Sequence, residues 1–167
     1  MKMNRLLFLL LFMLLGTLHA NDPLIQKKKV PLNIALPLLK SIDHHAILLG
    51  SGPTHMYAFI DPICPRSRDF VEMISENKKM QKLYTYHLFF YELERFHTRA
   101  IIADIYSADN PLKRMNKIMI EKQKLKGLEV ITNNVNKEIN EIAKIANELD
   151  IYKRPYLFVV KPKKGDK

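Results

Sequence analysis

Apolar residues recur along the chain in runs and periods that predict alternating strands and helices. Runs rich in aromatic and β-branched residues indicate three buried strands, at residues 57–60, 84–93 and 156–160. Apolar positions at helical spacing predict helices at residues 64–83 and 136–149 and a helical region over 94–126. Strands separated by helices in this way indicate an α/β domain.

The first twenty residues have the pattern of a secretory signal peptide. Lys2 and Arg5 precede an unbroken apolar run of ten residues, and a small residue, Ala20, closes the segment. A helix of ten apolar residues is too short to cross a bilayer, which takes about 20. We expect cleavage after Ala20 and export to the periplasm, with an uncleaved membrane anchor as the alternative.

Residues 21–55 precede the strand at 57–60 and form an N-terminal preamble. Their apolar positions between Leu36 and Leu49 predict a short helix or strand followed by another strand. The residues from Gly50 to Pro53 predict a turn.

The chain has one cysteine, Cys64, placed between the strand at 57–60 and the helix that follows. Pro65 is typical of the first helical turn, so Cys64 is predicted at a helix N-terminus. The partial positive charge of that terminus, with Arg66 and Arg68 close by, favours the thiolate. A thiolate is the nucleophile of disulfide exchange. A lone cysteine is otherwise a small buried hydrophobe.

The stretch F-I-D-P-I-C-P-R-S-R-D-F resembles the active-site segment of the DsbC/DsbG family of periplasmic thioredoxin-fold disulfide isomerases. The resemblance implies a thioredoxin-like domain at 56–167 with a helical insertion at about 94–126. Cys64 corresponds to the attacking cysteine, and Ser67 stands where the family has a second, resolving cysteine. The preamble is too short for the separate dimerisation domain of that family.

A second point of resemblance is Pro155, at the start of the last predicted strand. Thioredoxin-like proteins have a cis-proline facing the active-site cysteine at this place, and a plain trans proline is the alternative. Arg154 would then present its backbone to a substrate and add positive charge near Cys64. The resemblance makes Cys64, Ser67 and Pro155 the candidate catalytic residues and Pro65, Arg66 and Arg154 the candidate substrate-binding residues.

The chain ends soon after the strand at 156–160, where a thioredoxin fold continues with one more strand and helix. We therefore expect a sheet that lacks these elements or replaces them. A strand from the preamble is one candidate to cover the exposed edge.

The formal net charge is +10, from 27 basic and 17 acidic residues. The basic residues are dispersed and are not interleaved with an aromatic motif, which argues against nucleic acid as a partner. The spacing of the histidines at 44, 45, 55, 87 and 97 with Cys64 fits no zinc pattern, so neither a metal nor another cofactor is expected.

Two functions are compatible with these residues. The first is a monothiol isomerase or reductase that exchanges disulfides through Cys64. Its partners would be exported proteins with cysteines, together with a membrane reductase or a small thiol that resolves the mixed disulfide. The second is a redox-inactive, chaperone-like binding module with the same fold. A surface-binding basic protein that makes no use of the thiol is a third alternative.

Overall fold

The structure is a computed structural model that describes residues 29–123 and 127–162. The expected signal peptide and the last five residues lie outside this described part. The helices and strands, in chain order, are α2 (Leu32–Ser41), η1 (Asp43–His45), β1 (Ile47–Leu49), β2 (Thr54–Ile60), α3 (Pro65–Glu76), α4 (Lys78–Leu83), β3 (Tyr84–Phe90), η2 (Glu94–Phe96), α5 (Arg99–Tyr106), α6 (Pro111–Met119), α7 (Asn133–Glu148) and β4 (Tyr156–Val160).

The four strands form one mixed sheet in the order β1-β3-β2-β4. The central pair, β2 and β3, is parallel, with Tyr57 opposite His87 and Ile60 opposite Phe90. Both outer strands are antiparallel to their neighbours: β1 to β3 and β4 to β2. Since Phe59 lies opposite Tyr156, the carboxyl end of β2 and the start of β4 meet at the same end of the sheet.

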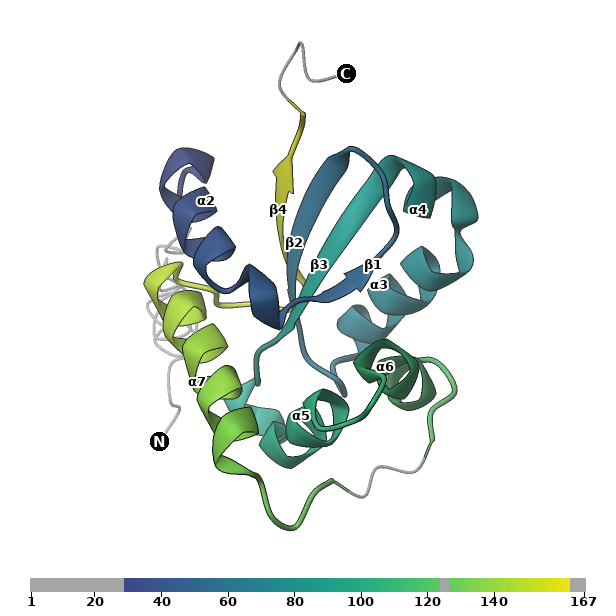
Figure 1. Ribbon diagram of the computed structural model, residues 1–167, viewed down its shortest axis with the longest axis vertical. Coiled ribbons are helices and arrows are strands. Elements are labelled where there is room, and N and C mark those ends of the chain that lie inside the picture. The colour runs from purple at the N-terminus through teal and green to yellow at the C-terminus, as the bar shows by residue number, and fades with distance from the viewer. Residues whose placement is uncertain (1–28, 124–126, 163–167) are drawn as a thin grey trace, which may run out of the picture.

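Helices cover both faces of this sheet (Figure 1). Alternate residues of β2 point to opposite faces, so Ala58 and Ile60 join one apolar core, and Tyr57 and Phe59 join the other. The first core is closed by α3, α5 and α6. The second is closed by α2 and α7, which lie together on the left of Figure 1. The preamble from residue 29 therefore contributes α2 and β1 to the same sheet and cores as the rest of the chain.

The mixed α/β class and the helical region after β3 are confirmed. Two predicted boundaries were wrong. The helix expected to run unbroken to Leu83 stops at Glu76, because Asn77 leaves helical geometry and its side chain accepts a hydrogen bond from Met80 N at 3.0 Å, capping a new helix, α4. The strand expected to reach Leu93 ends at Phe90, because the following residues turn to bind groups near Cys64.

Two expectations concerned the edge of the sheet at β4: that no further strand follows it, and that a preamble strand could cover it. No strand follows β4 before residue 162, so β4 is an edge of the described sheet. The preamble strand β1 does not cover this edge, since it pairs with β3 at the opposite side. Among the described helices, none is long and apolar enough to cross a membrane.

Candidate active site

The loop after β2 places Cys64 immediately before α3. Cys64 is the N-cap residue, with extended backbone angles, and Pro65 occupies the first helical position. The carbonyl of Cys64 accepts the first bond of the helix, from Arg68 N at 3.0 Å. The position predicted from the sequence is therefore confirmed. The side chain of Cys64 caps no N–H of the helix, and the residue is only 5% exposed.

Asp61 fixes the shape of this loop. Its carboxylate Oδ1 accepts hydrogen bonds from the backbone N–H groups of Ile63 at 3.0 Å and Cys64 at 3.2 Å. Its Oδ2 accepts from Leu93 N and from the Thr98 hydroxyl, both at 2.8 Å. Asp61 is fully buried, so these four donors replace the water that a carboxylate otherwise needs. They tie the Cys64 loop to the segment between β3 and α5.

The start of β4 faces the thiol. The Arg154–Pro155 peptide bond is cis, as the sequence suggested, and the carbonyl of Arg154 lies 3.8 Å from Cys64 Sγ, which donates to it. Cys64 and Pro155, 91 positions apart along the chain (155 minus 64), are thus brought together where β2 and β4 meet. The presentation of the Arg154 backbone to a substrate stays a prediction.

The guanidinium of Arg154 points into the protein instead of to solvent. Arg154 is 6% exposed, and its Nε and Nη2 donate to the carbonyls of Tyr91 at 2.8 Å and Glu92 at 3.2 Å. The guanidinium also stacks on the Tyr91 ring, 3.9 Å from its centroid. Burial lowers the pKa of Arg154 to about 10, against the opposing pull of Tyr91, Asp61 and Cys64. At neutral pH the side chain is therefore a buried cation, and its hydrogen bonds stabilise the loop between β3 and η2.

The remaining predicted residues lie around the first turn of α3. Ser67 is fully buried, and its hydroxyl accepts a hydrogen bond from Asp61 N at 3.2 Å. Pro65 and Arg66, the two residues that follow Cys64, are exposed. Arg68 is half-buried and donates from Nε to the Pro62 carbonyl at 2.8 Å. Arg68 therefore stabilises the loop and is not directed at a ligand.

A cavity of about 320 Å³ lies next to Pro155. It is lined by Lys29, Tyr152, Lys153, Tyr156 and Leu157 as well as by Pro155. The Lys29 ammonium lies over the Phe158 ring, 4.6 Å from its centroid, and donates to the Leu157 carbonyl. Burial, and then repulsion by Lys153, lower the pKa of Lys29. The surface beside Pro155 is thus basic and aromatic.

The architecture resembles several solved structures. ScsC from Proteus mirabilis in a compact conformation matches with a TM-score of 0.58 and 14% identity over 98% of this chain and 82% of that chain. A disulfide interchange protein from Neisseria gonorrhoeae matches with a TM-score of 0.54 and 16% identity over 73% and 90%. BdbD from Bacillus subtilis, in its oxidised form, matches with a TM-score of 0.51 and 13% identity over 70% and 82%.

The fold is thioredoxin-like. At these identities the likeness establishes the fold, and it does not single out the DsbC/DsbG family that the sequence motif resembles. No protein-family model and no curated protein matches the sequence.

The sequence did not reveal the groups that hold the Cys64 loop in place. For Asp61, the sequence favours a residue that begins the turn over one that tunes the thiol, and it does not point to Thr98 or Tyr91. A carboxylate directly before a proline and three residues ahead of the cysteine is a signal for Asp61. No sequence pattern indicates that Thr98 and Leu93 contact Asp61, because these residues lie in a different segment, which approaches Asp61 only in the folded protein.

Proposed function

We propose that the protein acts in thiol–disulfide exchange as a monothiol, with Cys64 as its nucleophile. The observation that carries the proposal is the position of Cys64. It stands at the N-terminus of α3, and its Sγ lies 3.8 Å from the carbonyl of the residue before a cis-proline. The attack on a disulfide is made by a thiolate, and Cys64 is the only sulfhydryl of the chain.

The exchange requires two thiol-attack steps. The Cys64 thiolate attacks one sulfur of a partner's disulfide, forming a Cys64–partner mixed disulfide and releasing the other sulfur as a thiolate, with no net oxidation. Ser67, the residue in the position of a resolving thiol, has no sulfur to break this bond. A second thiol, from the partner itself or from a small molecule, must then attack. The first route isomerises the partner and frees Cys64. The second route reduces the partner and leaves the small molecule on Cys64, from which a further small thiol removes it as a disulfide.

The partners we propose are exported proteins with cysteines, in the periplasm, with isomerisation of the DsbC/DsbG type as the specific activity. An extended segment of such a partner would lie along the start of β4, beside Pro155. The cavity lined by Tyr152, Lys153 and Tyr156 favours an apolar or acidic side chain next to the partner's cysteine.

The experiment compares the wild-type protein with the variant Ser67→Cys. Each reduced protein is mixed with glutathione disulfide and followed by intact mass and peptide mapping. The wild type should accumulate a stable Cys64–glutathione disulfide. Ser67→Cys should release the glutathione and form an internal disulfide between Cys64 and the introduced thiol, since N-cap and third helical residues lie within one turn. Ser75→Cys, with its thiol two turns further along α3, is the matched control and should keep the glutathione on Cys64.

The burial of Cys64 favours a second candidate, a binding module that makes no use of the thiol. One measurement distinguishes the exchange activity from the binding function. It compares the rate at which Cys64 reacts with glutathione disulfide in the folded protein with the rate in the urea-unfolded chain. Exchange chemistry predicts a faster reaction in the folded protein at neutral pH. A folded-state rate at or below that of the unfolded chain would overturn the proposed activity and leave the binding function.

A further inference from the structure

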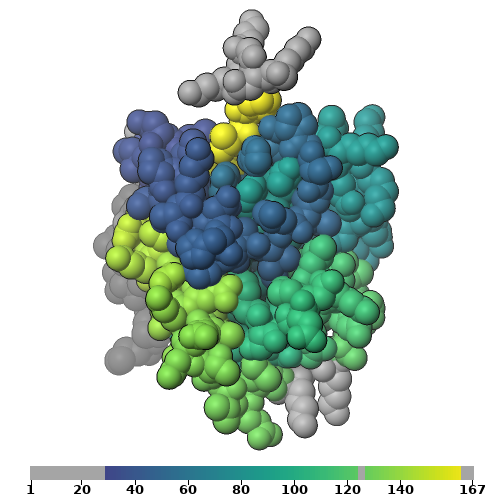
Figure 2. Space-filling model, in the orientation of Figure 1, coloured from purple at the N-terminus to yellow at the C-terminus, as the bar shows by residue number. Residues whose placement is uncertain are grey.

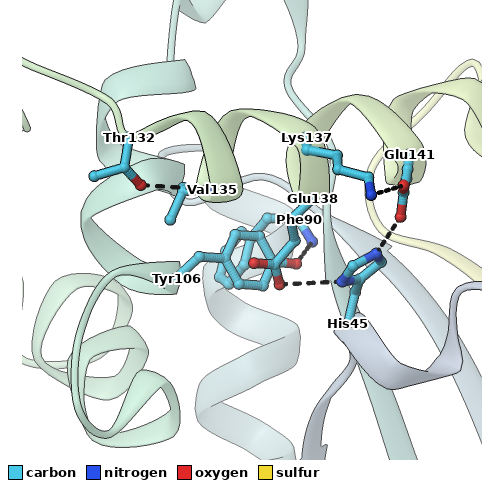
Figure 3. Close-up of polar contacts among 8 residues, drawn as sticks. All are labelled: His45, Phe90, Tyr106, Thr132, Val135, Lys137, Glu138 and Glu141. Atoms are coloured by element: carbon cyan, nitrogen blue, oxygen red, sulfur yellow. Dashed lines mark hydrogen bonds and ion pairs between the residues drawn. The ribbon is translucent and has the colours of Figure 1, made fainter.

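Two histidines and two glutamates meet on the side of the sheet covered by α2 and α7. His44 and His45 belong to η1, and Glu138 and Glu141 lie one turn apart on α7. His45 Nε2 lies 2.7 Å from Glu141 Oε2, and His45 Nδ1 lies 3.6 Å from Glu138 Oε1. Figure 3 shows both carboxylates reaching from α7 to the two nitrogens of the His45 ring. We refer to these four residues as the η1–α7 cluster.

The exposed member, His44, completes a set of ligand atoms. The His44 ring lies 3.9 Å from that of His45, centroid to centroid. One nitrogen from each histidine and one oxygen of Glu141 all lie within 4.8 Å of one another. Ligand atoms of a tetrahedral Zn²⁺ are about 3.3 Å apart, given metal–ligand distances of about 2.0–2.1 Å. His44 is exposed, so a change of its side-chain rotamer can bring its ring nitrogen closer to the other two atoms.

Glu138 occupies the place of a supporting carboxylate. A metal-binding histidine usually donates its second ring N–H to a carboxylate, which orients the ring and makes the ligand nitrogen more basic. With His45 Nε2 facing Glu141, Nδ1 faces Glu138.

The surroundings of the cluster also favour a cation. A cavity of about 330 Å³ adjoins it, lined by His44, His45, Glu138 and Asp109 among others. Carboxylates thus gather at one point of a chain whose formal net charge is +10. Within the described part of the chain, the basic side chain paired with the cluster is Lys137, 3.8 Å from Glu141 and largely exposed. In Figure 2 the blue N-terminal segment meets yellow-green α7 and the green α5–α6 segment on this face.

We propose that His44, His45 and Glu141 bind one Zn²⁺ ion, with Glu138 orienting His45. Two imidazole nitrogens and one carboxylate oxygen suit Zn²⁺, whereas Ca²⁺ and Mg²⁺ prefer sites made of oxygen atoms. The fourth position is left for water. A ligating imidazole nitrogen is unprotonated, so any proton on His45 Nε2 passes to solvent when the ion binds. The ion joins η1 to α7 and is a separate site from the Cys64 thiol.

The sequence did not reveal this site because its ligands come from two distant segments. His45 and Glu141 are 96 residues apart, so no short spacing motif exists. The helical spacing of Glu138 and Glu141 places them on one face of α7, but nothing in the sequence indicates that η1 packs there.

The test is calorimetric titration of the metal-free protein with ZnCl₂ alone. We expect one ion per chain. His44→Ala and Glu141→Gln should each weaken binding at least tenfold, and Glu138→Gln should weaken it about tenfold, as is usual for a supporting carboxylate. With Zn²⁺ at about 100 times the dissociation constant, the unfolding equilibrium constant of the wild type should fall about 100-fold. For His44→Ala the same addition should lower the unfolding equilibrium constant about tenfold at most, because the ion is then no more than about ten times the weakened dissociation constant.

Three controls decide between this site and other ligands. Cys64→Ser, His55→Gln and His97→Asn should bind Zn²⁺ as the wild type does, and His97 is an exposed histidine away from the cluster. Loss of binding in Cys64→Ser would assign the ion to the thiol and overturn the proposal. Loss of binding in His55→Gln but not in His44→Ala would overturn it equally. So would a wild-type protein that takes up no zinc. None of these results bears on disulfide exchange by Cys64.

Discussion

Two polar networks lie at opposite ends of β2, and they use different chemistry. At the carboxyl end, Asp61 accepts four hydrogen bonds from Ile63, Cys64, Leu93 and Thr98. Near the amino end, the His87 ring shares a hydrogen bond with His55 at 2.8 Å and contacts Asp43 at 2.5 Å, with the Tyr57 ring stacked on it. We call these the Asp61 network and the His87 network.

The Asp61 network has donors whose protons stay in place at moderate pH, whereas the His87 network contains imidazoles that gain or lose a proton. Every partner of Asp61 is a backbone N–H or a hydroxyl, so the bonds of that network keep the same direction at any moderate pH. The His87 network joins two imidazoles to a carboxylate beside a cavity of about 720 Å³, and its bonds depend on protonation. The end of the sheet that positions Cys64 is thus held rigidly, and the other end responds to pH.

Asp61→Asn should have the largest effect on stability. The substitution keeps the size of the side chain but turns one acceptor into an N–H₂ group, which faces donors and leaves some of them buried without partners. We expect a loss of about 3 kcal/mol in the free energy of unfolding, measured in urea. Asp69→Asn, on the exposed side of α3, is the control and should change stability by less than about 0.5 kcal/mol. Equal effects at the two positions would mean that Asp61 does not hold the loop.

Arg154→Met is expected to cost about 2 kcal/mol. Methionine keeps the aliphatic length but loses the donors to the Tyr91 and Glu92 carbonyls and the stacking on Tyr91. Arg66→Met, an exposed neighbour of the same site, should be close to neutral. The double variant with Asp61→Asn tests whether the two residues act together. A loss smaller than the sum would show coupling, and strict additivity would show that the guanidinium and the carboxylate stabilise the loop independently.

The sequence was sufficient for the elements and for the position of Cys64. The strand at 156–160 and the helix start after Cys64 could be predicted because each depends on residues that are close in sequence. The same is true of Pro111, which begins α6 after an Asn110 cap. The cis state of the Arg154–Pro155 bond was inferred from the resemblance, since a proline at a strand start is compatible with either isomer.

What the sequence could not give is the direction of individual side chains. Arg154 was expected to add charge near Cys64, but the sequence did not indicate that its guanidinium donates to two carbonyls from the segment after β3. Asn77, expected to be part of a continuous helix, caps a new one. In both cases a polar side chain finds a backbone partner, and the choice among possible partners depends on packing that periodicity does not encode.

The smallest expected effect is the pH dependence contributed by His87. Burial lowers the pKa of His87 below its ordinary value and outweighs the attraction of Asp43, which raises it; His55 lowers it further. The unfolded chain therefore binds this proton more readily than the folded protein. The stability that His87 contributes is complete above the unfolded pKa of about 6.5 and decreases as the pH falls through that value towards the folded pKa.

The measurement is urea unfolding at about pH 7.5 and about pH 5.5, on either side of the unfolded pKa. The wild type should lose more stability on acidification than His87→Gln, while His97→Asn should keep the wild-type slope. A variant that loses more stability than the wild type would reverse the sign. The Asp43 carboxylate would then hold His87 as an imidazolium against the cost of burial, and the His87 network would stabilise the fold through an ion pair instead of through neutral rings.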